Sequence, residues 1–181
     1  SYSYLGLVGH PRINEAAKKA VDKFGTGTHG VRSLAGTLTI HTELEETIAN
    51  FKHAEAASTY SSGYATNLSV ISTLMGRGDY VFSDKLNHAS IVDGCLMSGT
   101  EFRRFRHNDM EHLEGLLKNA PSDVAKLVIA DSVFSMDGDI IDLPKVIELT
   151  KKYKAWLMID EAHSVGVLGK RGTGIEEYFG L

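Results

Sequence analysis

The sequence predicts an α/β fold: a three-layer sandwich in which a mostly parallel central sheet is covered by helices on both faces. Two observations predict it. Short strand-like segments alternate regularly with segments of helical periodicity from residue 55 onward. The apolar run at residues 155–159 is continuous, as in a parallel strand buried on both faces. No repeat, low-complexity tract or linker rich in Pro or Ser interrupts the chain, so we expect residues 1–181 to form a single domain.

The first elements that we expect are two helices separated by a loop. Pro11 suits the first position of a helix, and the apolar residues that follow it keep helical spacing. Residues 25–36 are rich in Gly and Thr and predict a long loop. Thr42 and Glu45 match the Ser/Thr-x-x-Glu pattern of a capping box, which predicts that a second helix begins at Thr42.

From there on, strands and helices alternate. The expected strands cover residues 55–60, 80–82, 101–106, 126–130 and 155–160. The expected helices cover residues 64–75, 88–97, 110–117 and 143–153. Because a helix separates each strand from the next, we expect the strands to lie parallel or mostly parallel.

Composition limits the class of protein. The chain is 43% hydrophobic and 23% charged, which is ordinary for a globular domain, and its net charge of -4 gives no basic surface for nucleic acid. The single Cys95 excludes an internal disulfide and fits a reducing compartment, so we expect a cytoplasmic protein. No apolar run approaches the roughly 20 residues that span a bilayer. The chain begins with Ser1 rather than Met and is expected to be part of a longer protein.

The most informative segment is Asp-Glu-Ala-His at residues 160–163, directly after the last apolar run. In an open α/β sheet, ligands bind at the carboxyl ends of the strands. Two kinds of protein carry these four letters: ATPases that depend on nucleic acid, and enzymes that bind a pyridine cofactor. An ATPase needs a G-x-x-x-x-G-K-[ST] phosphate loop earlier in the chain, and the nearest approach, residues 169–171, follows the box and has Arg in the hydroxyl position. We keep the ATPase as a distant competitor.

The segment Ser61-Ser62-Gly63-Tyr64 lies between the first expected strand of this series and a helix. Small residues at the start of a helix leave backbone N–H groups directed at an anion, and the helix dipole assists. Taken alone, an ordinary serine N-cap is the commoner explanation of this pattern.

His88 and Ser135 follow two further strands. His88 stands near the start of a helix, where its ring could lie flat against a planar ligand. The commoner explanation is a surface or core histidine beside a cap made by Asn87 or Asp84. Ser135 could donate to a ligand oxygen, although the Asp-Gly pair after Met136 also fits an ordinary turn.

Asp160 and His163 are harder to explain without a ligand. A carboxylate at the buried end of a strand costs several kcal/mol unless a cation or a donor meets it. A protonated pyridine nitrogen would meet it, and so would a Lys or Arg side chain. A metal site of Asp160, Glu161 and His163 lacks any H-E-x-x-H or C-x-x-C support, so we expect none, and Glu161 is expected to cap or pair locally. Together, the four strand ends suit a phosphorylated pyridine aldehyde.

Seven segments resemble, in order, the α-oxoamine synthases, a family of fold-type I pyridoxal-phosphate (PLP) enzymes. They are Tyr2-Ser3-Tyr4-Leu5-Gly6-Leu7, Gly36-Thr37 with His41 and Leu44-Glu45, Ser62-Gly63-Tyr64, Asn87-His88-Ala89-Ser90, His107-Asn108-Asp109-Met110, Phe134-Ser135-Met136-Asp137-Gly138, and Asp160-Glu161-Ala162-His163-Ser164 with Gly166. The resemblance implies that the chain is the large, PLP-binding domain portion of such an enzyme.

The resemblance also implies a role for each site residue. The backbone around Gly63 and Tyr64 would bind the cofactor phosphate. His88 would stack on the pyridine ring, and Asp160 would pair with the ring nitrogen. Ser135 and His163 would hydrogen-bond the phenolic oxygen. The same comparison implies that His88, Asp160 and His163 act in catalysis.

The family condenses an amino acid with an acyl thioester, usually acyl-CoA, and most members release carbon dioxide as well as CoA. Members are homodimers, so we expect the same of the parent protein. The segments look most like serine palmitoyltransferases, and members that make 8-amino-7-oxononanoate or 2-amino-3-oxobutyrate share most of them.

One feature of the family is missing from this chain. The Schiff-base lysine of the family lies in a Thr/Ser-rich motif downstream of the Asp-x-x-His pair, and the chain reaches Leu181 without that motif. Lys170 does not match it. The chain alone is therefore expected to be inactive. A non-catalytic subunit that stabilises an active relative is the alternative.

Overall fold

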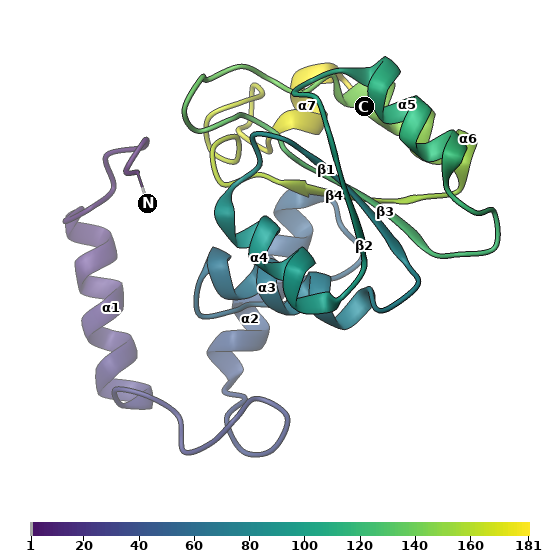
Figure 1. The fold of residues 1–181 in the computed structure, drawn as a ribbon. Coiled ribbons are helices and arrows are strands. Elements are labelled where there is room, and N and C mark those ends of the chain that lie inside the picture. The colour runs from purple at the N-terminus through teal and green to yellow at the C-terminus, as the bar shows by residue number, and fades with distance from the viewer. Residues whose placement is uncertain (1) are drawn as a thin grey trace. The chain divides into compact units, whose positions relative to one another are not determined.

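The computed structural model describes residues 2–181, so the prediction drawn from Ser1 lies outside the described residues. The chain divides into two compact units, Ser1–Thr59 and Tyr60–Leu181, whose elements are labelled in Figure 1. The single domain expected over residues 1–181 stays a prediction. None of the helices within residues 2–181 combines the length and the hydrophobicity needed to cross a bilayer.

The first unit contains two helices, α1 (Pro11–Phe24) and α2 (Thr39–Lys52). Helix α1 begins at Pro11 as predicted, and the His10 imidazole caps it by accepting a hydrogen bond from the Arg12 N–H. The loop expected at residues 25–36 is present between the two helices.

The predicted capping box of α2 is wrong, because the helix begins at Thr39, one turn before the predicted start. His41 closes the first turn instead, since its Nδ1 accepts a hydrogen bond of 3.0 Å from the Leu38 N–H. The Glu45 carboxylate has other partners: it accepts a hydrogen bond of 2.9 Å from Arg32 and one of 2.8 Å from the Thr59 N–H.

The second unit is built on a four-stranded sheet with the order β2-β1-β3-β4, in which every pair is parallel. The strands are β1 (Tyr80–Asp84), β2 (Glu101–Phe105), β3 (Lys126–Asp131) and β4 (Trp156–Asp160). The helices are α3 (Gly63–Leu74), α4 (Ala89–Ser98), α5 (Met110–Asn119), α6 (Leu143–Tyr153) and α7 (Ile175–Phe179). All but α7 agree with the predictions to within three residues at each end.

The strand expected at residues 55–60 does not form. Its sequence, Glu-Ala-Ala-Ser-Thr-Tyr, is mostly small and polar and has little apolar surface to pack on a sheet. The Thr59 N–H, which a sheet would pair with a neighbouring strand, donates to Glu45 instead. The predicted strand at residues 55–60 is therefore wrong.

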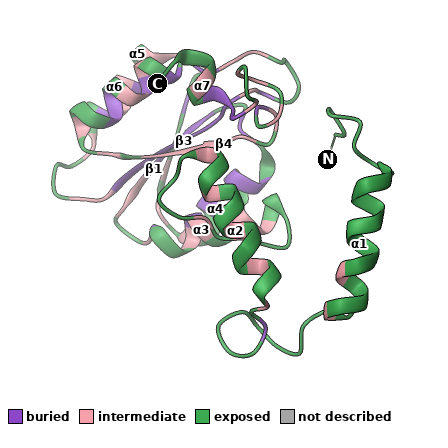
Figure 2. Cartoon of the chain, turned by 180° about the vertical axis from the view of Figure 1, so that it is seen from behind, coloured by how far each residue is buried: buried purple, intermediate pink, exposed green. Residues whose placement is uncertain are grey.

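Helices cover both faces of the sheet, which confirms the predicted three-layer α/β sandwich (Figure 1). Because successive side chains of a strand point to opposite faces, β1 and β3 contribute side chains to two separate hydrophobic cores, one on each face of the sheet. Val81, Leu127 and Ile129 pack with Ile71 of α3 and with Ile91 and Cys95 of α4. Phe82, Val128 and Ala130 pack with Leu113 and Leu117 of α5 and with Val146 and Leu149 of α6. Figure 2 shows this burial along β1 and β3.

Candidate functional site

Two aspartates lie side by side where β3 and β4 end. Asp160 is the last residue of β4, and the parallel register places it opposite Asp131, the last residue of β3. Met158 and Ile129, two positions earlier in these strands, pack in the core under α3 and α4. Because side chains two residues apart share a face, both carboxylates are on the face that α3 and α4 cover.

Asp160 is half-buried, and hydrogen-bond donors meet both of its carboxylate oxygens. Its Oδ2 accepts a bond of 2.8 Å from Asn67 of α3, and its Oδ1 accepts one of 3.0 Å from the Ala162 N–H. Among the described residues, no Lys or Arg forms an ion pair with it. The salt bridge considered as an alternative is therefore not what satisfies this carboxylate.

A chain of hydrogen bonds joins Asp160 to His88. The Asn67 amide, which is 4% exposed, also donates to Ser90 Oγ at 2.9 Å. Ser90 Oγ in turn lies 2.7 Å from His88 Nδ1. The structure thus links Asp160 and His88, which were both predicted as site residues, through Asn67 and Ser90, which were not.

His88 is the N-cap of α4, in place of the Asn87 or Asp84 cap that was considered as the ordinary explanation. Its Nδ1 accepts a hydrogen bond of 3.2 Å from the Ser90 N–H. The His88 ring itself is exposed and meets the ring of Tyr64 edge-on, with 6.5 Å between the centroids. The capping hydrogen bond fixes the Nδ1 edge of the imidazole, and the rest of the ring stays accessible to a ligand.

Asp131 is 3% exposed and differs from Asp160 in its partners. Its Oδ2 accepts a hydrogen bond of 3.2 Å from the His88 N–H, and its Oδ1 is buried without a partner in the described structure. Burial and the adjacent charge of Asp160 raise the pKa of Asp131 to about 7. One carboxyl group of this pair is therefore easily protonated near neutral pH.

The start of α3 carries Gly63 and Tyr64. Ser62 is an ordinary N-cap, as considered above, since its Oγ accepts a hydrogen bond of 3.1 Å from the Ala65 N–H. The N–H groups of Gly63 and Tyr64 belong to the first helical turn, where helices leave donors without an intrahelical partner. A side chain added at Gly63 would meet nothing within 4 Å, so the space beside this backbone is open.

Ser135 and His163 come from the segments that follow β3 and β4. Ser135 is exposed at the end of a hairpin, residues 133–140, in which Val133 and Ile140 form an antiparallel bridge. His163 is half-buried in the turn after β4. Neither residue joins the hydrogen-bonded chain between Asp160 and His88.

Glu161 pairs locally, as predicted. Its Oε2 accepts hydrogen bonds of 2.6 Å from Ser164 Oγ and 2.9 Å from the Ile175 N–H, which begins α7. In residues 2–181, no group of three or more His, Cys, Asp or Glu side chains is placed to hold a metal ion.

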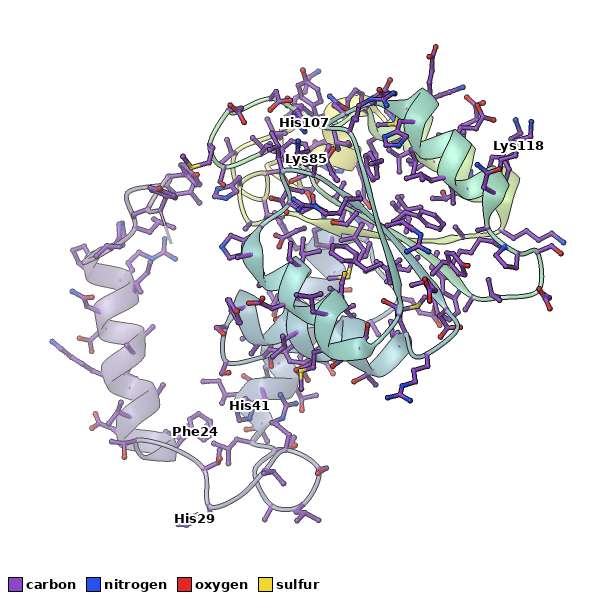
Figure 3. All side chains as sticks on the ribbon, in the orientation of Figure 1. Phe24, His29, His41, Lys85, His107 and Lys118 are labelled. Atoms are coloured by element: carbon purple, nitrogen blue, oxygen red, sulfur yellow. The ribbon has the colours of Figure 1, made fainter. Side chains whose placement is uncertain are left out.

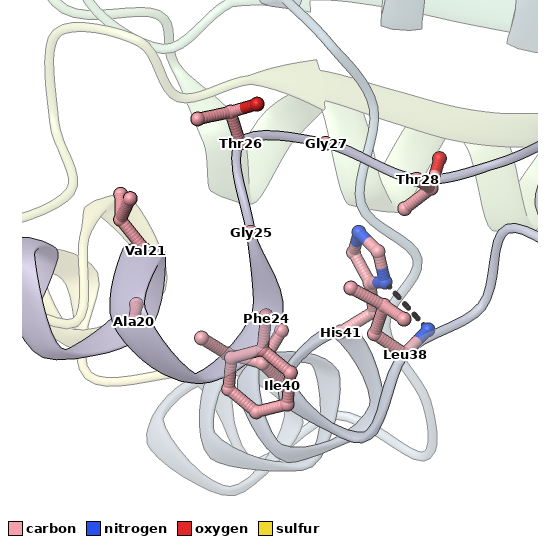
Figure 4. A pocket seen from close by; sticks show the side chains of 10 residues that line it. All are labelled: Ala20, Val21, Phe24, Gly25, Thr26, Gly27, Thr28, Leu38, Ile40 and His41. Atoms are coloured by element: carbon pink, nitrogen blue, oxygen red, sulfur yellow. Dashed lines mark hydrogen bonds between the residues drawn. The ribbon is translucent and has the colours of Figure 1, made fainter.

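A pocket in the first unit lies away from these residues in sequence and contains none of them. It is formed by the end of α1, the loop after it and the start of α2 (Figure 4). Its only polar contact drawn in that view is the His41 bond to the Leu38 N–H.

Sequence reasoning missed Asn67, Ser90 and Asp131 as site residues. Asp131 carried a usable signal, because it ends an apolar strand just as Asp160 does. Ser90 stood in the segment Asn87-His88-Ala89-Ser90 but was given no role of its own, and Asn67 carried no signal, because the roles of polar residues near helix starts depend on which helices pack together.

Comparison with known proteins identifies similar sequences along the whole chain. A family model described as aminotransferase class I and II matches residues 1–179. An 8-amino-7-oxononanoate synthase from Bacillus velezensis is 49% identical over 181 residues, which is 100% of this chain and 46% of that protein. A serine palmitoyltransferase from Sphingobacterium spiritivorum is 48% identical and is matched over 45% of its length. The chain thus spans about half the length of these relatives.

A solved structure shows the same fold. The serine palmitoyltransferase from S. paucimobilis with bound PLP and myriocin matches with a TM-score of 0.96 and 44% sequence identity. The match covers 100% of this chain and 47% of that one. The strand order and helix layers above are therefore those of a fold already seen with PLP bound in another protein.

Proposed function

Because this chain belongs to the class I and II aminotransferase family, we propose that it forms the cofactor-binding part of a PLP-dependent α-oxoamine synthase. The parent protein would be a C-acyltransferase that condenses an amino acid with an acyl-CoA or an acyl carrier. The α-carbon would bond to the acyl carbonyl carbon as the thioester C–S bond breaks and the thiol leaves, and the bond from the α-carbon to the amino-acid carboxylate would break to release carbon dioxide. The names of both relatives, an oxononanoate synthase and a palmitoyltransferase, support this class of reaction.

The observation that carries the proposal is the environment of Asp160. Its carboxylate is half-buried at the carboxyl end of β4, and only N–H donors from Asn67 and Ala162 meet it in the described structure. A carboxylate in such a place favours a nearby cation. The protonated nitrogen of a pyridine ring has that charge, so the residues present fit PLP.

Other residues fit the remaining parts of the cofactor. The first-turn N–H groups of Gly63 and Tyr64, with open space beside them, would bind the phosphate. The exposed ring of His88 would lie against the pyridine. Ser135 and His163 would donate to its phenolic oxygen. When bound, PLP supplies an electron sink for the carbanion at the amino-acid α-carbon.

Three residues of this chain would then act on the reacting groups. Asp160 would keep the ring nitrogen protonated, because its negative charge favours the cationic form. His88, fixed by its bond from the Ser90 N–H, would orient the ring. His163 would tune the phenolic oxygen by hydrogen bonding. The lysine that binds PLP covalently in this family matches no position here, so the parent protein would supply it elsewhere.

Two substrate pairs are supported by the names of the relatives. A serine palmitoyltransferase joins serine to a palmitoyl group. In a decarboxylative condensation the amino acid keeps its side chain, so 8-amino-7-oxononanoate, with a methyl group beside its amine carbon, requires alanine and a dicarboxylic acyl group. The relatives named 8-amino-7-oxononanoate synthase are at least as similar to this chain as the relative named serine palmitoyltransferase. We therefore propose both substrate pairs. We also propose that the parent protein is a homodimer and is located in the cytoplasm.

The cofactor proposal is tested by titrating the full-length protein with PLP and recording its absorbance. Replacing Asp160 with Asn removes the charge but keeps similar shape, so we expect PLP to bind at least about tenfold more weakly, as expected when a buried charge loses its counter-ion. Asp22→Asn, at an exposed position of α1, is the matched control and should bind PLP normally. Absence of PLP binding by the unmodified protein contradicts the proposal.

The substrate is tested by supplying alanine or serine with a dicarboxylic acyl-CoA or palmitoyl-CoA and measuring CoA release and product mass. Turnover with serine and palmitoyl-CoA favours the palmitoyltransferase, and turnover with alanine and the dicarboxylic thioester favours the synthase. Turnover that appears only after an active relative is added would identify the non-catalytic subunit instead.

A further inference from the structure

His107 lies outside the candidate site, between two aspartates. It follows β2, and Figure 3 labels it near Lys85, which follows the adjacent β1. Its Nδ1 lies 3.0 Å from an oxygen of Asp84, and its Nε2 lies 2.5 Å from an oxygen of Asp139. Each ring nitrogen therefore faces its own carboxylate.

This geometry favours a charged ring. A neutral imidazole has one N–H, so one nitrogen would direct a lone pair at a carboxylate oxygen, whereas an imidazolium donates from both nitrogens. Burial opposes the charge, but the hydrogen bonds and negative charges of Asp84 and Asp139 outweigh it and raise the pKa of His107. The adjacent Arg106 is paired with Asp109 and so is engaged elsewhere.

Asp84 provides a rigid anchor for the imidazolium. Its side chain is completely buried on the face covered by α5 and α6, and it also accepts hydrogen bonds of 2.8 Å from the N–H groups of Leu86 and Asn108. A carboxylate that accepts three hydrogen bonds is fixed in position. Asp84 thereby ties His107 to the end of β1.

Asp139 depends on His107 for the hydrogen bonding of its carboxylate. Its Oδ1 is buried without a partner, and His107 is the one donor to its carboxylate among the described residues. Asp139 lies in the hairpin of residues 133–140, which we call the Ser135 hairpin. Within this hairpin the Phe134 N–H donates to the Asp139 carbonyl oxygen at 3.0 Å, and the Gly138 N–H donates to the Phe134 carbonyl oxygen at 2.8 Å.

Two more contacts join His107 and Asn108, which follow β2, to the Ser135 hairpin. The His107 ring meets the buried ring of Phe134 edge-on, with 4.4 Å between the centroids. Asn108 donates a hydrogen bond of 3.1 Å to the Ile140 carbonyl oxygen. His107 and Asn108 therefore contact both sides of the hairpin, next to Ser135 in the chain.

We propose that His107 is a positioning residue whose imidazolium, held between Asp84 and Asp139, fixes the Ser135 hairpin and so sets where Ser135 is presented. The consequence for a bound cofactor rests on the function proposed above, whereas the fixing of the hairpin does not. Because the folded-state pKa of His107 is raised, the contact is fully present below about pH 6.5 and is lost as the pH rises through the folded pKa.

The test uses Asp139→Asn and Asp137→Asn in the full-length protein without PLP. The first substitution removes the charge that faces His107 Nε2, whereas Asp137 is exposed in the same hairpin and does not contact His107. Nuclear magnetic resonance of nitrogen-labelled histidine reports the protonation of both ring nitrogens. Hydrogen exchange of residues 132–142, followed by mass spectrometry, reports how well the hairpin is fixed.

We expect His107 to carry both protons at pH 6 and to titrate above the ordinary histidine range. Asp139→Asn should lower its titration midpoint and speed exchange in the hairpin about tenfold or more, as for the loss of a charge-assisted hydrogen bond, while Asp137→Asn changes neither. After division by the intrinsic exchange rate at each pH, exchange in the hairpin of the unmodified protein should speed up as the pH rises over the same range. A neutral His107 at pH 6, or equal exchange in the two variants, overturns the proposal.

A readout with PLP separates this inference from the proposed function. If the parent protein binds no PLP but His107 and the hairpin behave as expected, only the proposed function fails. If PLP binds and the hairpin is indifferent to Asp139→Asn, only the present proposal fails. If the charge of His107 had no part in fixing the hairpin, the exchange rates corrected for intrinsic amide chemistry would not change with pH.

Discussion

Asp131 and Asp160 are neighbours in register, yet their carboxyl groups have different surroundings. Asp160 receives N–H donors on both carboxylate oxygens, which stabilises its charge. Asp131 is almost completely buried, has one unpartnered oxygen and faces the charge of Asp160. A proton on Asp131 therefore lowers the repulsion between the two carboxyl groups at the ends of β3 and β4.

This contrast predicts how stability depends on pH. The pKa of Asp131 is about 7 in the folded chain, against about 3.9 when unfolded, so only the unfolded state releases the proton between these values. Asp131 thus lowers the free energy of unfolding progressively from about pH 4 to pH 7. We expect Asp131→Asn to remove this decline, so that the variant gains stability relative to the unmodified chain as the pH rises. Urea unfolding at several pH values measures it, and a difference that is constant with pH would contradict it.

At the level of elements, local signals predicted most of the helices and strands. The boundaries of α1 and α6 were predicted from Pro11 and from periodicity, which act within a few residues. The strand at residues 55–60 was wrong because a strand needs a partner, and none is encoded locally. The predicted start of α2 was wrong because Leu38 is the N-cap, and His41, rather than Glu45, accepts the hydrogen bond from the N-cap N–H.

In the candidate site too, local sequence signals predicted individual residues but not the contacts between distant segments. Asp160 and His88 could be named because each stands at the junction of a strand or a turn with the next segment. The hydrogen-bonded link between them could not, because Asn67 reaches Asp160 across 93 residues of chain. That contact depends on the packing of α3 over β4, which no local pattern specifies.

The packing of α3 against α4 supplies a prediction at this scale. A side chain added at Gly94 of α4 would lie 3.0 Å from the Asn67 carbonyl oxygen and 3.0 Å from Ile71 Cδ1. Gly94→Ala would therefore force the two helices apart, and we expect it to destabilise the fold by about 1–3 kcal/mol, as overpacked cores do. Thermal and urea unfolding measure the change.

Gly115 of α5 is the matched control, because an added side chain there would meet nothing within 4 Å. Alanine is the better helix former, so Gly115→Ala should stabilise the fold by up to about 1 kcal/mol. Opposite signs for the two substitutions would show that the close approach of α3 and α4 is required. If Gly94→Ala is also neutral or stabilising, the helices are packed less closely than the contacts at Gly94 indicate.

At the level of the whole chain, burial is distributed unequally between the two units. All hydrophobic side chains that are buried in the described structure belong to Tyr60–Leu181. Helices α1 and α2 have no buried residue, and Val8 and Leu34 are each 86% exposed. Polar contacts, such as those of Glu45 with Arg32 and Thr59, contribute to the order of the first unit. Polar contacts at exposed positions add little stability, so the resistance of the two units to unfolding should differ.

Limited proteolysis of the 181-residue chain tests this difference. Segments with few buried apolar contacts open at low free energy, and cleavage follows their open population. We expect the first cuts in the loop at residues 25–36, because both flanking helices lack buried residues, and survival of a fragment close to Tyr60–Leu181. Mass spectrometry of the fragments identifies the cuts. First cuts within β1–β4 would mean that the two cores under α3–α4 and α5–α6 are not what stabilises this chain.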